Sequence, residues 1–158
     1  MPTIHLTTFI AAPVEVVFNL SRSVDLHKKS MHKHQEEAVA GTRYGLMERE
    51  DTVTWKAKHF FKTRILRVKI SAMKKNEQFT DEQIDGDFKE MKHEHYFKPC
   101  DNGTIMIDLF HFESPYGHFG KWFNGLYFTR YMKNLLEQRN TIIKEFAENG
   151  KWKQLLIT

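Results

Sequence analysis

A nearly unbroken series of alternating segments between residues 51 and 113 limits most strongly what this chain can fold into. Side chains of a strand point alternately to its two faces, so alternation of apolar and polar residues predicts a strand with one buried face. Such segments occupy residues 51–61, 64–73, 76–83, 88–98 and 104–113. The connections between them are short, and Asn102-Gly103 predicts a tight hairpin turn with positive φ angles. We therefore expect one antiparallel sheet with a single apolar face.

The two ends of the chain add one further strand and several helices. Residues 3–10 alternate and predict an opening strand, Pro13 fits the first turn of a short helix, and residues 21–30 predict a second short helix. A weak strand is expected near residues 36–40. Beyond residue 117 the pattern predicts a long helix ending near Asn149. Its apolar stripe recurs at spacings of three and four and consists of Phe128, Met132, Leu135, Arg139, Ile142 and Phe146. The expected fold class is α+β, a helix-grip arrangement in which a curved antiparallel sheet of about seven strands holds the long C-terminal helix over a cavity.

Length and composition favour one domain. With 158 residues the chain can bury an apolar core without disulfides or a metal ion. We expect a single domain over residues 1–150 and a C-terminal tail over residues 151–158. Cys100 is the only cysteine, so no internal disulfide can form. No apolar run is long enough to span a membrane and no targeting segment is evident, so the expected location is cytoplasmic.

The net charge of +4 is modest, but some basic residues cluster. Lys56 and Lys58 share the outward face of one predicted strand, and Arg67 and Lys69 share that of the next. Outward lysine and arginine side chains are a common way to wet one face of an antiparallel sheet. Binding of nucleic acid or anionic lipid is the alternative, and we do not expect nucleic acid as a partner.

Four polar side chains fall on faces that are predicted to point inward: His59, Asp81, His93 and His95. Imidazole titrates near neutrality and a carboxylate can fix its tautomer, so such a cluster can orient a ligand or transfer protons. Buried polar side chains that merely satisfy one another are the alternative. Asp81, His93 and His95 are the candidate catalytic residues, although no recognisable catalytic motif surrounds them. Asp108 is in phase with neighbouring aromatic residues, but its face stays undecided.

A metal site is the rival explanation for these histidines. Two imidazoles and a carboxylate can bind zinc or iron, and His93 and His95 share one strand face. No HExxH motif and no paired cysteines accompany them, so we expect neither a metal nor another cofactor. His27, His32 and His34 belong to a polar region and are expected to be exposed.

Aromatic residues make up 13% of the chain, which suits a cavity for a flat or cyclic apolar ligand. Those expected to line or cover it are Trp55, Phe61, Phe79, Phe97, Phe119, Trp122, Phe123 and Tyr127. Ordinary core packing is the alternative for each. Arg139 lies on the apolar stripe of the long helix, where we expect it to reach toward solvent. Pairing with an inward carboxylate is its alternative.

An ordered set of motifs resembles the START and Bet v 1-like superfamily, also called SRPBCC. Residues 10–18, IAAPVEVVF, are similar to its strand-to-helix signature. The more specific motifs are Trp55-x-Ala57-x-His59-Phe60, Phe79-x-Asp81-Glu82-Gln83, Gly86, Phe88, His93-x-His95-x-Phe97, Gly103-Thr104-x-Met106-x-Asp108 and Pro115-x-Gly117. Together these resemble an uncharacterised bacterial subgroup described as ligand-binding or polyketide cyclase-like, over about residues 3–148.

The resemblance implies a hydrophobic cavity for a lipid, polyketide or similar small molecule, but it supplies no catalytic residue. Asp87 stands where the subgroup often has proline, and Met91 where tryptophan is frequent. The leading hypothesis is therefore binding or carriage of a small hydrophobic molecule. The alternative is a cyclase, aromatase or dehydratase that uses His93 or His95 for acid–base chemistry.

The tail beyond Gly150 is too apolar for a fully solvated end. We expect Trp152, Leu155 and Ile157 to dock on the protein itself or on a second copy, which would make a homodimer possible.

Overall fold

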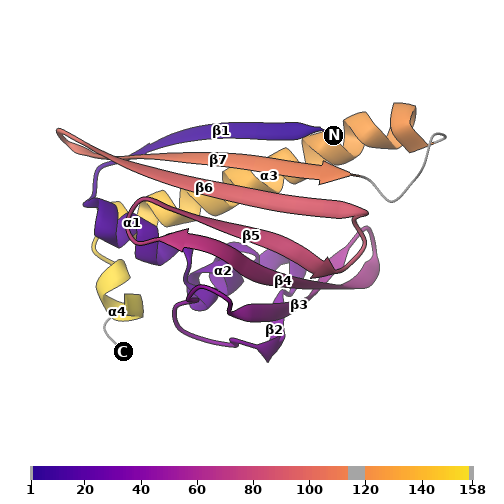
Figure 1. Ribbon diagram of the computed structural model, residues 1–158, viewed down its shortest axis with the longest axis horizontal. Helices are drawn as coiled ribbons and strands as arrows, with labels where there is room; N and C mark the ends of the chain where they lie inside the picture. Colours follow the sequence, from indigo (N-terminus) through magenta and orange to yellow (C-terminus); the bar gives the residue numbers. More distant parts are fainter. Residues whose placement is uncertain (1, 114–119, 157–158) are drawn as a thin grey trace.

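The computed structural model describes residues 2–113 and 120–156, with residues 120–124 described by their backbone alone (Figure 1). The elements are β1 (Thr3–Ile10), α1 (Val14–Ser21), α2 (Val24–Ser30), a short 3-10 helix (His32–His34), β2 (Glu37–Gly41), β3 (Thr52–His59), β4 (Lys62–Lys74), β5 (Gln78–Asp85), β6 (Glu90–Cys100), β7 (Gly103–Glu113), α3 (Gly120–Glu148) and α4 (Trp152–Leu156). None of these helices is long and apolar enough to cross a membrane.

The strands form one antiparallel sheet in the order β1-β7-β6-β5-β4-β3-β2. Each strand from β2 to β6 pairs with the next in the chain, and β1 pairs with β7 at one edge of the sheet. Figure 1 shows α3 running along one face of the curved sheet, where it contacts β1, α1 and α2. The predicted helix-grip fold is confirmed.

The alternation that predicts the strands also decides which side chains point toward α3. On β6 the buried residues are Met91, His93, His95 and Phe97, and on β7 they include Met106, Asp108, Phe110 and Phe112. The register places His95 opposite Asp108 and His93 opposite Phe110. The open question about Asp108 is thereby answered, because its side chain points inward with the aromatic residues.

Two hairpin turns differ from what their sequences indicate. At the β6–β7 turn neither Asn102 nor Gly103 has a positive φ. Glycine is instead required at position 103 because a Cβ there would lie 2.2 Å from the backbone oxygen of Ile10. At the β3–β4 turn, by contrast, Phe60 and Phe61 both have positive φ angles, of 53° and 62°.

The C-terminal tail folds back on its own chain. Gly150, with a φ of 79°, follows the end of α3 and lets the chain turn into α4. Trp152 and Leu155 are partly buried against the hydrophobic core, and α4 contacts α1. Ile157, the third residue expected to dock, lies outside the described residues.

Candidate functional site

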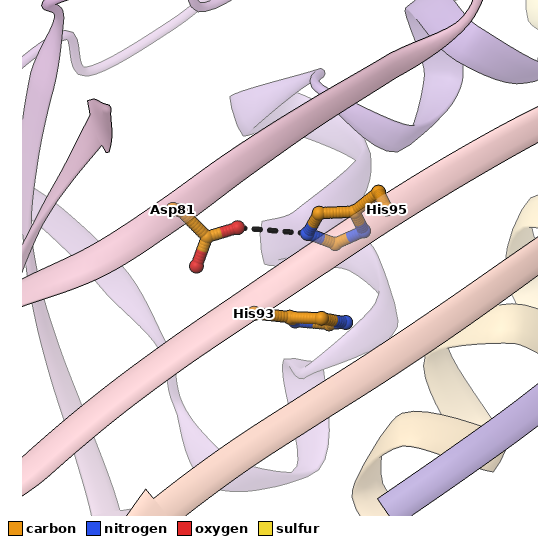
Figure 2. Close-up of side chains that lie close together, drawn as sticks. All are labelled: Asp81, His93 and His95. Atoms are coloured by element: carbon orange, nitrogen blue, oxygen red, sulfur yellow. Dashed lines mark hydrogen bonds and ion pairs between the residues drawn. The ribbon is translucent and has the colours of Figure 1, made fainter. Parts of the chain in front are cut away.

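A polar cluster lies on the inward face of the sheet, across β5, β6 and β7. Figure 2 shows the hydrogen bond between Nε2 of His95 and Oδ2 of Asp81. These two atoms are 2.7 Å apart. The Nε2 atom of His93 is 2.9 Å from Oδ1 of Asp108. The two imidazole rings are stacked obliquely, with 3.7 Å between their centroids. The Nε2 atom of each histidine therefore faces its own carboxylate, and we call Asp81, His93, His95 and Asp108 the inner cluster.

The long helix α3 completes the surroundings of Asp108. Asn140 donates a hydrogen bond from Nδ2 to Oδ2 of Asp108 at 2.7 Å, and Nη1 of Arg139 lies 3.4 Å from its Oδ1. Arg139 also donates to the backbone oxygen of Ser21. The expectation that Arg139 reaches toward solvent is wrong, and its alternative, pairing with an inward carboxylate, is what the structure shows. A buried carboxylate requires a compensating charge, and Arg139 supplies it.

These contacts fix the charges of the cluster. Burial alone would raise the pKa of Asp108, but the hydrogen bond from His93, the nearby His95 and the charge of Arg139 together hold that pKa well below its ordinary value. Burial likewise opposes ionisation of Asp81, yet its hydrogen bond with His95 lowers the pKa. Burial, followed by repulsion from His95, lowers the pKa of His93 from 6.5 to about 4. At neutral pH the cluster thus holds two carboxylates and a neutral His93.

Two adjacent cavities with shared lining residues lie between the sheet and α3. The inner cavity, of about 180 Å³, borders the inner cluster. The outer cavity, of about 330 Å³, lies toward the β3–β4 turn and falls in the range of small-molecule sites. Residues that line both are Glu36, Trp55, His59, Leu66, Phe88, Met132 and Leu135. Asp81 is the cluster carboxylate open to this space, because its side chain is 19% exposed whereas that of Asp108 is 0% exposed.

The outer cavity has its own polar group at His59. The Nδ1 atom of His59 is 2.6 Å from the Tyr131 hydroxyl, and the His34 ring stacks on the His59 ring at 4.6 Å. Burial is the main cause that lowers the pKa of His59. His59 therefore does not join Asp81, His93 and His95 in one cluster, although it faces the same space.

The histidines expected at the surface divide into two groups. His32 is exposed, as predicted. His27 and His34 are only partly exposed, because His27 bonds to Glu36 at 2.7 Å and His34 stacks on His59.

Only some of the aromatic residues expected at the cavity lie on its walls. Trp55, Phe79 and Tyr127 line the cavities. Phe97 is buried against Phe18 and is not among the lining residues. Phe119 and the side chains of Trp122 and Phe123 lie outside the described part of the chain.

The prediction for Phe61 is wrong. The strand ends at His59, so the alternation does not continue into the turn, and Phe61 is fully exposed. Its neighbour Phe60 lines the outer cavity instead.

The sequence analysis does not name several of the lining residues as cavity residues, although some of them belong to the predicted apolar stripe of the long helix. Tyr131 belongs to the long helix but not to the predicted stripe, whereas Phe128, Met132 and Leu135 belong to it. Phe88 belongs to the motifs of the family resemblance, but it lies between β5 and β6, so strand alternation does not place it at the cavity. Such residues are recognised only once the packing of α3 on the sheet is known.

Asp81, His93 and His95 also offer possible ligand atoms within 4.8 Å of one another, as a metal site requires. The Nε2 atoms of the two histidines are, however, already engaged by different carboxylates. Nε2 of His95 is directed to Asp81 on β5, whereas Nε2 of His93 is directed to Asp108 on β7, on the other side of β6. Binding a metal ion through both Nε2 atoms would therefore replace these two hydrogen bonds.

Comparison with solved structures identifies the class of fold. A crystal structure of TTHA0849 from Thermus thermophilus has a TM-score of 0.72 at 19% identity, covering 92% of this chain and 97% of the other. Ara h 8.0201 gives a TM-score of 0.68 at 14% identity over 92% and 97% of the two chains. The di-domain ARO/CYC protein StfQ from the steffimycin biosynthetic pathway gives 0.73 at 11% identity, over 94% of this chain and 51% of the other.

The protein therefore has the Bet v 1-like, or SRPBCC, helix-grip fold, as the sequence motifs indicate. No protein-family model matches the chain, and no curated protein matches its sequence. At these identities the likeness establishes the fold alone, so function must be argued from the site.

Proposed function

We propose that this protein binds one small, mainly apolar molecule between the sheet and α3, with a polar group of that molecule placed against Asp81 and His95. The observation that carries the proposal is a pair of adjacent cavities that share part of their lining, the outer one with aromatic walls and the inner one bordered by Asp81, His93 and His95. Mainly apolar walls with a few convergent polar groups are the usual form of a small-molecule site.

The charges of the lining favour a ligand that donates hydrogen bonds. Each arginine among the described lining residues already pairs with a carboxylate: Arg22 with Glu48, Arg64 with Asp87, and Arg139 with Asp108. Asp81, by contrast, is an ionised carboxylate that faces the cavity. A carboxylate on the ligand would be repelled there, whereas a hydroxyl or amine group would be accepted. The proposed ligand class is therefore a hydroxylated or amino-substituted apolar molecule, such as an aromatic, a polyketide or a lipid alcohol.

A matched pair of ligands tests this selectivity. We expect 2-naphthol to raise the melting temperature more than 2-naphthoate, since the two share one ring system and differ in the group presented to Asp81. A ligand at 100 times its dissociation constant adds about 2.7 kcal/mol to the free energy of unfolding, a readily measured shift. Asp81→Asn removes the charge and should reduce the preference. If no member of a wider panel of apolar alcohols, phenols and amines stabilises the protein, the proposal fails.

Catalysis is the second candidate, and one observation favours it. The inner cluster holds a neutral His93 and two histidine–carboxylate pairs at the end of a cavity, which suits proton transfer in a cyclase, aromatase or dehydratase reaction. Positioned acid–base groups contribute about a hundredfold or more to turnover. His93→Gln and His95→Gln would each then lower turnover of a bound polyketide by that factor while ligand binding persists. Turnover that survives both substitutions would exclude this function.

A further inference from the structure

The β3–β4 turn places two phenylalanines where the backbone disfavours them. The two-residue loop between His59 and Lys62 consists of Phe60 and Phe61, both with positive φ. Such loops strongly favour Asn-Gly, because bulky side chains are strained at positive φ. Phe61 is also fully exposed, so its side chain gains nothing from burial. A costly, solvent-exposed aromatic residue at a strained position points to a role outside the fold itself.

The turn lies beside other exposed apolar residues at the mouth of the outer cavity. Phe60 is 6.2 Å from Tyr127 and 4.5 Å from Tyr131 between ring centroids. Tyr127 and the adjacent Leu126 of α3 are both largely exposed. Figure 1 places the β3–β4 turn and the N-terminal part of α3 at the same end of the molecule. We call Phe60, Phe61, Leu126 and Tyr127 the mouth patch.

Positive charge flanks the β3–β4 turn. Residues 56–64, which contain the turn, include four lysine and arginine residues and no aspartate or glutamate. Lys58 and Lys62, which flank the turn, are exposed and form no ion pair with any described carboxylate. Asp87, the carboxylate that an ion pair places nearest to this turn, is bound to Arg64. An anionic partner is therefore complementary to this end of the molecule.

We propose that the mouth patch, with Lys58 and Lys62, docks onto the surface of a membrane that contains anionic lipids. Exposed aromatic side chains partition into the membrane interface, and flanking lysines are attracted to anionic headgroups. Nucleic acid would also be attracted by the positive charge, but its binding would not explain why exposed aromatic residues occupy the strained backbone of the β3–β4 turn. Since Phe60 lines the outer cavity, docking turns the cavity mouth toward the bilayer, where an apolar ligand can enter or leave without crossing water.

Vesicle flotation tests the proposal, with phosphatidylcholine vesicles compared against vesicles that also contain phosphatidylglycerol. The protein should bind only the anionic vesicles, and added salt should weaken binding. One lysine near such a surface contributes about 1 kcal/mol, so Lys58→Gln with Lys62→Gln should lower the partition coefficient about thirtyfold. The matched control, Lys75→Gln with Lys98→Gln, changes the net charge equally at the opposite end of the sheet and should have an effect below about threefold.

The aromatic part of the patch has its own pair of variants. Phe61→Ala should lower vesicle binding about tenfold, since a phenylalanine contributes at least that much when it leaves water. Tyr44→Ala removes another exposed aromatic ring, from the β2–β3 connection, and should leave binding unchanged. Failure of the wild-type protein to bind anionic vesicles at low ionic strength would overturn the proposal, as would equal loss in test and control variants.

Two other outcomes would assign the mouth patch to a different partner and likewise overturn the proposal. One is a dimer in solution that Phe61→Ala converts to monomer. The other is oligonucleotide binding that depends on Lys58 and Lys62 without any vesicle binding. Ligand binding in the cavity is measured separately by thermal shift, so failure of the membrane proposal leaves the proposed function standing.

Discussion

Asp108 holds the inner cluster together, because its carboxylate contacts side chains from both the sheet and α3. It lies within hydrogen-bonding distance of His93 and Asn140 and within ion-pair distance of His95 and Arg139. His95 lies between Asp81 and Asp108. Its Nε2 bonds to Asp81, while its Nδ1 is buried without a hydrogen bond of good geometry. The cluster therefore depends on one fully buried charge and its compensation.

Removing that charge should destabilise the protein strongly. Asp108→Asn leaves Arg139 buried without its carboxylate, and breaking a buried pair in this way costs about 3 kcal/mol or more. Urea unfolding measures the loss. The double variant Asp108→Asn with Arg139→Met should recover part of it, because the remaining uncompensated charge is gone. If Asp108→Asn lowers the free energy of unfolding by less than about 1 kcal/mol, the Asp108–Arg139 pair does not stabilise the protein as proposed.

The lowered pKa of His93 predicts how stability depends on pH. The folded protein holds this pKa near 4, below the ordinary 6.5, so the unfolded chain binds more protons between these values. The contribution of His93 to the free energy of unfolding should then fall as the pH drops below 6.5, by about 2 kcal/mol between pH 7 and pH 5. The lowered pKa values of Asp81 and Asp108 make their contribution vanish only below their ordinary 3.8, outside this window.

His93→Gln provides the control for this dependence. Without the titrating ring, the difference in unfolding free energy between pH 7 and pH 5 should shrink markedly. A variant with the same pH dependence as the wild-type protein would contradict the assignment to His93.

The sequence predicts the inward residues of this site better than their partners. Period-two alternation correctly places Asp81, His93 and His95 on one face, because strand geometry fixes it. The same alternation leaves Asp108 undecided only because a carboxylate is unexpected among aromatic residues. Arg139 could not be paired with it in advance, since that contact depends on how α3 lies across the sheet.

At the scale of elements, the two hairpin turns show where local signals fail. The sequence predicts positive φ at Asn102-Gly103, but there glycine is needed for the close approach of the backbone of Ile10. The turn with positive φ angles is instead formed by Phe60 and Phe61, which no turn preference would select. Turn chemistry is therefore a good guide to where a hairpin reverses and a weaker one to its backbone conformation.

The strain at Phe61 can be measured directly. Phe61→Gly should raise the free energy of unfolding by about 0.5–1 kcal/mol, because glycine adopts positive φ without a steric cost and no burial is lost. Chemical denaturation checks the value. Tyr44→Gly, at a position without positive φ, should lower stability and serves as the control. A Phe61→Gly protein that is less stable than the wild type would show that the phenylalanine contributes to the fold itself.

At the scale of the whole molecule, the fold is predictable because its parts are long and periodic. The predicted strands over residues 88–98 and 104–113 agree with β6 and β7 to within about two residues. The cavities are predictable only in outline. Their walls include residues of β3, β5, β6 and α3. Side chains such as Phe88 and Tyr131 line the same cavity only after those elements pack.

The C-terminal tail also concerns the whole molecule, because its packing bears on whether the protein is a monomer or a dimer. The apolar side chains of α4 already pack on the core of their own chain, so we predict a monomer at all accessible concentrations. Sedimentation equilibrium measures the mass. A dimer that dissociates when residues 151–158 are deleted would instead indicate a swapped or shared tail.

The central claim is that a ligand occupies the space between the sheet and α3, and a calorimetric titration tests it most directly. Ala57 lines the outer cavity, whereas Ala40 is exposed on β2. Ala57→Leu fills part of the cavity and Ala40→Leu makes the same change outside it. We predict that one ligand binds per wild-type chain. Its affinity should be at least about tenfold lower in Ala57→Leu and unchanged in Ala40→Leu. Equal affinity in the wild type and Ala57→Leu would show that the ligand binds elsewhere.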